Sequence, residues 1–144
     1  MQRYVEEVAV GTALEPVRFG PISTKDLVKW AAAADDYHEI HYDKDYALAQ
    51  GLPNVVVHGP LKLGLMGRLL MGFVGAQGWL QRFNCRYGAL DVPGTTLEVG
   101  ATVTAVRPES GEVELAITVV NELGTATASG SATVRLPRRG APAV

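Results

Sequence analysis

The residues best suited to chemistry are two histidines in a short acidic segment. His38 and His41 lie between positions 35 and 43, together with four carboxylate residues. Asp36 and His41 are five positions apart, and a loop that bends back around the apolar side chain of Ile40 would bring them together. A carboxylate that polarises a water, beside a histidine that shuttles protons, forms a general acid–base pair near neutral pH.

The same residues allow two other interpretations. A zinc or iron site would take His38, His41 and a carboxylate as ligands. A His-x-x-His pair in a loop needs a third ligand from elsewhere, and the sequence offers no second cluster, so we expect no metal. In the other interpretation, which spacing alone favours, Asp36 caps a turn and His41 makes a buried structural hydrogen bond. The third histidine, His58, would either contact a substrate or bond a backbone carbonyl.

Two helices should flank this segment. The residues from Ser23 to Asp26 have the form of a capping box, and apolar residues at helical spacing follow. This pattern predicts a helix over 24–34. Asp43 is a suitable N-cap for a short helix over 44–50. The acid–base segment therefore lies in a connection between helices, where functional side chains are commonly presented.

The long apolar segment after His58 is expected to form a helix from Pro60 to about residue 74, because proline suits the first helical position. Its apolar residues cover most of the helical wheel, a pattern typical of a helix that is enclosed on nearly all sides. A sheet should therefore wrap around it. Each glycine inside it costs about 1 kcal/mol relative to alanine. Two explanations of these glycines are open: close packing of the helix against the sheet, and a groove for a substrate. The glycines are Gly64, Gly67, Gly72 and Gly75.

From Trp79 onward the hydrophobic period changes to two, which predicts strands separated by turns rich in Gly, Pro and Asn. Because the turns are short, we expect the strands to form an antiparallel meander. The fold class is therefore α+β, with a helix lying on one sheet. One domain should span 1–136, and a flexible tail should span 137–144. The predicted strands are 79–90, 97–107, 112–121 and 124–136.

Composition limits the function classes. The 144 residues carry 13 Lys and Arg against 15 Asp and Glu, a formal net charge of −2. The chain thus lacks the basic excess that nucleic acids and anionic membranes attract. Its only cysteine, Cys85, has no partner for an internal disulfide, and its first residues lack the apolar core of a signal peptide. We therefore expect a cytoplasmic protein that binds neither nucleic acid nor membrane.

Residue identities favour the acid–base interpretation. The positions that carry a spaced motif are Asp36, Ile40, His41, Ala47 and Val57 to Gly59. With them the chain resembles the MaoC-like hot-dog family of (R)-specific enoyl-CoA hydratases and 3-hydroxyacyl-thioester dehydratases. The family signature is Asp-x-Asn-Pro-Ile/Leu-His, a small residue six positions later, and a Val-His-Gly before the central helix. His38-Glu39 replaces the Asn-Pro pair here, and Gly64 and Gly67 stand where some members place a serine.

The resemblance implies a single hot-dog domain, in which an antiparallel sheet wraps around the long central helix. It also implies hydration of a trans-2-enoyl-CoA to a 3-hydroxyacyl-CoA, or the reverse dehydration. Asp36 and His41 would activate the water, and the backbone N–H of Gly59 would bind the thioester oxygen. Further contacts with substrate would come from His58, His38 and Gly64. No metal or redox cofactor is implied.

The resemblance implies partners as well. Two such domains would pair, as a homodimer or as a heteromer with another hot-dog subunit, and acyl-CoA would bind at their junction. Arg82, Arg86 and Lys62 would meet CoA phosphates or would simply be solvated. Two subgroups are similar: hydratases of short branched or dicarboxylic enoyl-CoAs, and small subunits of heteromeric actinobacterial hydratases that act on steroid side-chain CoA esters. The alternatives are a non-catalytic acyl-CoA-binding subunit and a hot-dog thioesterase.

Overall fold

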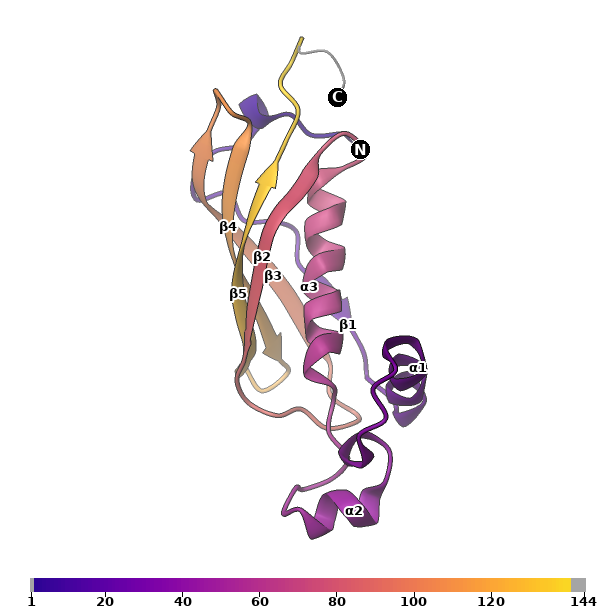
Figure 1. Cartoon of the computed structure of the whole chain (residues 1–144). Coiled ribbons are helices and arrows are strands. Elements are labelled where there is room, and N and C mark those ends of the chain that lie inside the picture. Colours follow the sequence, from indigo (N-terminus) through magenta and orange to yellow (C-terminus); the bar gives the residue numbers. More distant parts are fainter. Residues whose placement is uncertain (1, 141–144) are drawn as a thin grey trace.

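The computed structural model describes residues 2–140, which form one antiparallel sheet and a long helix beside it (Figure 1). The strand order is β1-β3-β4-β5-β2, and the sheet curls along α3, so the expected α+β hot-dog fold is confirmed. None of the described helices has the length and apolar character needed to cross a membrane. The elements are η1 (Val5–Glu7), β1 (Val17–Phe19), α1 (Thr24–Ala34), η2 (Glu39–His41), α2 (Lys44–Ala49), α3 (Gly59–Val74), β2 (Trp79–Tyr87), β3 (Leu97–Arg107), β4 (Glu112–Asn121) and β5 (Ala126–Arg135).

The helix α2 lies beyond one end of the sheet, and α1 lies beside the first part of α3 (Figure 1). The capping box predicted for α1 is confirmed. The hydroxyl of Ser23 accepts the N–H of Asp26 at 3.3 Å, and the Asp26 carboxylate accepts the N–H of Ser23 at 2.9 Å. The carboxylate of Asp43 caps α2 by accepting the N–H of Tyr46 at 3.0 Å. Local hydrogen bonds therefore set the start of both helices, as their sequences predict.

The central helix α3 begins at Gly59, one residue before the expected start, and Pro60 follows within its first turn. One side of α3 packs on the sheet, but Gly64 and Gly72 on the other side are exposed, and Met71 keeps 52% of its surface accessible. The expectation that α3 is enclosed on nearly all sides is therefore wrong for the single chain, because one sheet covers one side only. Its buried residues are Leu61, Lys62, Leu65, Met66, Leu69, Leu70, Phe73 and Val74.

The strands β3, β4 and β5 form the expected meander, but β2 does not belong to it. β2 pairs with β5 at the far edge of the sheet rather than with β3. The connection between β2 and β3 does not form a hairpin, because it bonds other segments instead. The Asp91 carbonyl accepts the N–H of Val57 at 2.8 Å. The Thr95 carbonyl accepts the N–H of Ile22 at 2.8 Å. This segment thus crosses the end of the sheet and ties the start of α3 to the sheet.

The start of the expected C-terminal tail contacts the N-terminal segment. The N–H of Val5 donates to the Pro137 carbonyl at 3.1 Å. The guanidinium of Arg139 pairs with the Glu7 carboxylate and lies 4.9 Å from the centroid of the Tyr4 ring. Residues 137–139 are therefore part of the folded structure, and the rest of the tail from 141 to 144 lies outside the described residues.

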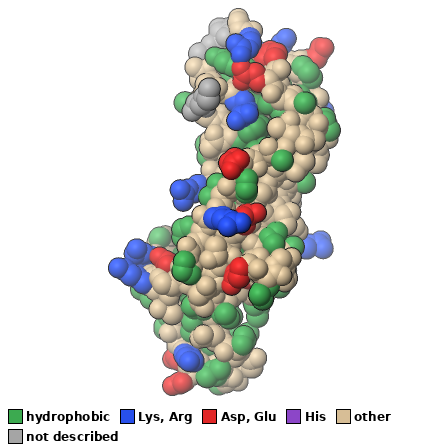
Figure 2. Space-filling view, turned by 180° about the vertical axis from the view of Figure 1, so that it is seen from behind, with side chains coloured by type: hydrophobic (Ala, Val, Ile, Leu, Met, Phe, Trp, Pro, Cys, Tyr) green, Lys and Arg blue, Asp and Glu red, His purple; other side chains and the backbone are tan. Residues whose placement is uncertain are grey.

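Figure 2 shows the side of the molecule that faces away in Figure 1, where acidic and basic side chains are interspersed. Exposed ion pairs of the chain include Arg18 with Glu98 at 2.6 Å and Arg107 with Glu114 at 2.7 Å. Such exposed pairs add little to stability. The mixed surface on this side agrees with the small net charge of the chain.

Candidate active site

Three neighbouring segments bring the candidate residues together where α1, η2 and α3 meet. The cap residue of α1, Asp35, adopts the left-handed conformation with φ of 52°. The N–H of the next residue, Asp36, bonds the carbonyl of Ala31 at 3.0 Å. The left-handed residue ends the helix and redirects the chain, so that Asp36 leads into the loop. η2 then holds His41, and α3 begins directly after His58.

His41 is the buried residue of the loop, whereas Ile40, the expected apolar anchor, is only half-buried. The His41 Nδ1 lies 2.7 Å from the carbonyl oxygen of Val56, to which it can donate. The N–H of Val56 in turn donates to the Ile40 carbonyl at 3.0 Å. The structural interpretation, in which His41 makes a buried hydrogen bond, is thus correct on this contact. The same bond orients the ring and leaves Nε2 free for acid–base chemistry.

His58 is completely buried and stacks on His41, with ring centroids 3.7 Å apart and an interplanar angle of 18°. Among the described residues, neither of its ring nitrogens has a hydrogen-bond partner. Burial lowers the pKa of His58, and the neighbouring His41 lowers it further, while the backbone and carboxylate of Asp36 act in the opposite direction. The structure therefore favours a neutral His58 ring beneath His41.

The side chains of Asp36, His41 and His58 offer oxygen and nitrogen atoms that all lie within 4.8 Å of one another. The expected convergence of Asp36 and His41 is therefore present. These are also ligand types for zinc or iron. Stacked imidazoles direct their in-plane lone pairs side by side rather than toward one ion, so one ring would have to turn. The arrangement suits a water between an acid and a base better than a metal.

Gly59 places the N-terminus of α3 beside this cluster, since it directly follows His58. The N–H groups of a first helical turn have no acceptor within the helix, and the helix dipole adds partial positive charge there. A Cβ on Gly59 would lie 3.1 Å from the ring of Tyr87 on β2. Glycine thus lets an aromatic ring pack directly on the helix backbone. This end of α3 can stabilise a negatively charged oxygen.

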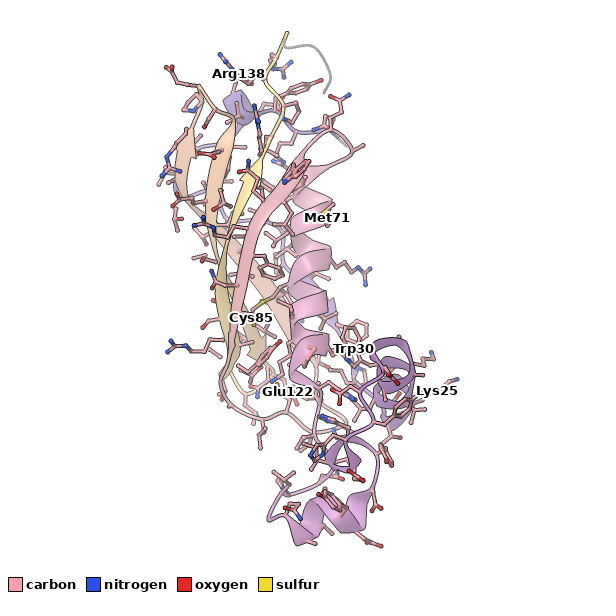
Figure 3. The ribbon with its side chains drawn as sticks, viewed as in Figure 1. Lys25, Trp30, Met71, Cys85, Glu122 and Arg138 are labelled. Carbon is pink, nitrogen blue, oxygen red and sulfur yellow. The ribbon has the colours of Figure 1, made fainter. Side chains whose placement is uncertain are left out.

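The two other expected contact residues lie at the margin of the cluster. His38 is exposed, and its Nδ1 accepts the N–H of Ile40 at 3.3 Å, so it caps η2. Its ring centroid lies 6.3 Å from that of His41. A Cβ on Gly64 would lie 3.0 Å from the ring of Trp30, which reaches from α1 toward α3 (Figure 3). Close packing of a side chain from another helix therefore explains this glycine.

The buried ion pair of Lys62 and Asp91 is a feature that sequence reasoning missed. Lys62 Nζ lies 2.6 Å from Asp91 Oδ2, and the two side chains are 3% and 1% exposed. Lys62 also donates to the Ala89 carbonyl at 3.1 Å, and Asp91 accepts from Asn121 at 3.1 Å. The expectation that Lys62 meets CoA phosphates is therefore wrong, because its ammonium is buried against a carboxylate. A signal existed, because Asp91 is the only acidic residue between positions 46 and 97.

Comparison with known proteins identifies the family to which the chain is similar. A family model described as "MaoC like domain" matches residues 6–124. The 3-oxo-4,17-pregnadiene-20-carboxyl-CoA hydratase beta subunit of Mycobacterium tuberculosis is 28% identical over 113 residues, which cover 78% of this chain and 84% of that protein. Similar solved structures include R-hydratase PhaJ1 from Pseudomonas aeruginosa, with a TM-score of 0.86, 23% identity and coverage of 94% and 86% of the two chains. A chain of the ChsH1-ChsH2 complex from Mycobacterium tuberculosis has a TM-score of 0.80, 23% identity and coverage of 89% and 98%.

The matched range contains the loop with Asp36 and His41, the whole of α3 and four of the five strands, β1 to β4. The resemblance read from the motif residues is confirmed by this match. The solved structures share the fold over nearly the whole chain. The chain therefore belongs to the MaoC-like domain family.

Proposed function

We propose that this protein is a hydro-lyase that hydrates a trans-2-enoyl-CoA to a 3-hydroxyacyl-CoA, or catalyses the reverse dehydration. The observation that carries the proposal is the convergence of the Asp36 carboxylate and the His41 ring within 4.8 Å, beside the N-terminus of α3. Family membership supports it, and so does the likeness to a subunit of a CoA-ester hydratase.

Hydration needs a base for the water and an acid for the α-carbon of the substrate. A water between Asp36 and His41 loses a proton to one of them as its oxygen bonds to C3 of the enoyl group. The electron pair of the C2–C3 double bond then moves toward the thioester oxygen. The other residue of the pair gives a proton to C2, which restores the carbonyl. His41 acts through Nε2, because Val56 holds Nδ1.

The negative charge that develops on the thioester oxygen needs a donor that is already in place. In this proposal the N–H of Gly59 supplies it, with help from the dipole of α3. His58, His38 and Gly64 border the bound acyl-CoA. No metal or redox cofactor takes part, because acid–base chemistry completes every step. A cytoplasmic location stays a prediction.

Two alternatives keep the same fold. A non-catalytic acyl-CoA-binding subunit is supported by the likeness to a protein that is itself one subunit of a hydratase. A thioesterase would direct the Asp36 carboxylate at the thioester carbonyl. The pairing of Asp36 with a hydrogen-bonded His41 favours hydration, since neither alternative needs both residues.

The working unit in this proposal contains two hot-dog domains, as a homodimer or as a heteromer. The single chain leaves one side of α3 exposed around Met71 and leaves β2 at an open edge of the sheet. A second domain would cover both. Acyl-CoA would then bind at the junction, close to the site at the start of α3.

Loss of the enoyl absorbance of crotonyl-CoA, and of longer or branched enoyl-CoAs, tests the proposal directly. Asp36→Asn and His41→Ala should each lower kcat/KM by about 100-fold or more, the usual contribution of a general acid or base. Asp35→Asn is the matched control, because it removes a neighbouring exposed carboxylate and because asparagine tolerates the left-handed backbone at that position. This control should keep wild-type activity.

Each alternative gives a different result in the same assay. Release of free CoA would favour the thioesterase. Binding of CoA esters without turnover, both alone and with a candidate hot-dog partner, would contradict the hydratase and favour the non-catalytic subunit.

A further inference from the structure

The strand β2 forms the longer of the two open edges of the sheet. It pairs with β5 alone, whereas the other edge strand, β1, has only three residues. Beyond β1, the N-terminal segment covers β3, since Gly11 and Leu14 each donate a backbone hydrogen bond of 2.9 Å to it. Exposed aromatic residues stand at the two ends of β2: Trp79 is 65% exposed and Tyr87 is 46% exposed. An open edge with exposed apolar side chains is a template for another strand.

The open edge of β2 carries positive charge only. Arg82 and Arg86 are exposed on the sheet face that turns away from α3, as is Asn84, which bonds the Ser131 hydroxyl across the sheet at 2.7 Å. The described residues contain no ion pair that involves either arginine. The nearest acidic residue along the chain is Asp91, whose carboxylate is buried against an internal lysine. The edge therefore presents two uncompensated guanidinium groups.

Pairing of β2 with a second copy of itself would set these charges against each other. In a two-fold antiparallel pair, residues equally distant from the axis lie opposite one another. An axis at Asn84 sets Arg82 opposite Arg86 of the second copy, and an axis at either arginine sets it opposite itself. An axis at Phe83 or Cys85 leaves copies of one arginine as diagonal neighbours, about 7–8 Å apart. Every such register therefore brings like charges within reach.

We propose that the β2 edge docks the edge strand of a different hot-dog chain, one that presents Asp or Glu at alternating positions, in preference to a second copy of this chain. The proposal rests on the two-domain unit of the proposed function and names the kind of partner that completes it. Like charges opposite each other disfavour the self-pair, and carboxylates opposite the arginines favour the mixed pair. The exposed aromatic residues at the two ends of β2 would become buried in that pair.

Native mass spectrometry of the full chain tests this inference without any substrate. The samples are the wild type, the variant R82E/R86E, and their equimolar mixture, each at low and at high salt. The mixture should form a 1:1 heterodimer with a Kd about tenfold or more below that of either self-dimer, and high salt should weaken it. R82Q/R86Q removes the charges with less risk to folding, and it should self-associate more tightly than the wild type.

The matched control is K25E/K29E, which makes the same charge change at two exposed positions of α1. Figure 3 shows Lys25 on this helix, on the other side of α3 from β2. The control variant should not form a mixed dimer with the wild type in preference to self-pairs. Two results would overturn the proposal: a wild-type homodimer as tight as the mixed dimer, or no association in any mixture. In the second case the arginines would merely keep the edge free. Association is measured directly, so a failure of the hydratase assay leaves this result intact.

Discussion

At the scale of single residues, the ion pair of Lys62 and Asp91 carries a stability prediction. Lys62→Met would leave the Asp91 carboxylate buried without a cation, so the free energy of unfolding should fall by about 3–5 kcal/mol. Adding Asp91→Leu should recover most of the loss, because an apolar pair of similar volume can replace a buried ion pair. Urea denaturation of the single and double variants measures both effects.

The control for this prediction is an exposed ion pair. Arg107→Met breaks the exposed contact with Glu114 at 2.7 Å, and it should cost less than about 1 kcal/mol. If Lys62→Met lowers the free energy of unfolding no more than Arg107→Met does, the buried pair contributes no more to stability than the exposed pair. The pair would then add no special stability to the contact between α3 and the segment before β3.

The predictability of the site differs from residue to residue. The closeness of Asp36 and His41 was predictable, because they stand in one short segment and match a spaced motif. The stacking of His58 on His41 and the pairing of Lys62 with Asp91 were not, because each contact joins separate segments through the packing of α3. Spacing along the chain carries no information on such contacts until the topology is known.

At the scale of elements, the close spacing of β2 and β5 depends on Gly130. A Cβ at this position would lie 2.1 Å from the backbone oxygen of Asn84 on β2, so alanine would force the two strands apart. We expect Gly130→Ala to destabilise the fold by about 1–3 kcal/mol. Gly100→Ala on β3 is the control, because nothing lies within 4 Å of its Cβ position. That variant should stay within about 0.5 kcal/mol of the wild type. Equal melting temperatures for the two variants would contradict the predicted clash.

The limits of α1 were predictable, because its capping box is local and its expected range of 24–34 is the observed one. The end of β2 was not, since the expected strand over 79–90 ends at Tyr87. The place of β2 was not predictable, because strand periodicity shows that a strand exists but not which neighbour it takes. The meander expected for all four strands holds only where short turns join them, from β3 to β5. Between β2 and β3, the path of the chain depends on hydrogen bonds from this connection to other segments.

At the scale of the whole molecule, the chain buries one continuous core but leaves some large apolar side chains exposed. Aliphatic side chains from α3, from the sheet and from the N-terminal segment form one core. Met71, Trp79 and Tyr87 stay exposed along α3 and β2. Composition agrees with an aliphatic core, since the chain has only 3 Phe and 2 Trp. It could not predict which side of the helix or which sheet edge is left open, because strand order decides that.

His58 also couples the stability of the whole molecule to pH. Burial, and next to it the neighbouring His41, lower the pKa of His58 below the ordinary value of 6.5 in the folded protein. As pH falls below 6.5, the unfolded chain binds a proton at His58 that the folded chain does not yet bind. The free energy of unfolding should therefore fall with pH in this range. One such proton contributes at most about 1.4 kcal/mol per pH unit.

Urea denaturation between about pH 7.5 and pH 5.5 checks this coupling. His58→Gln replaces the buried imidazole with a side chain that does not titrate, so the free energy of unfolding should depend less steeply on pH than in the wild type. His38→Gln is the matched control for the loss of an imidazole, because His38 is exposed and lies outside the stacked pair of His41 and His58. If all three proteins share one slope, another group must cause the acid sensitivity. If only His58→Gln flattens it, the buried ring that stacks on His41 at 3.7 Å is neutral in the folded state.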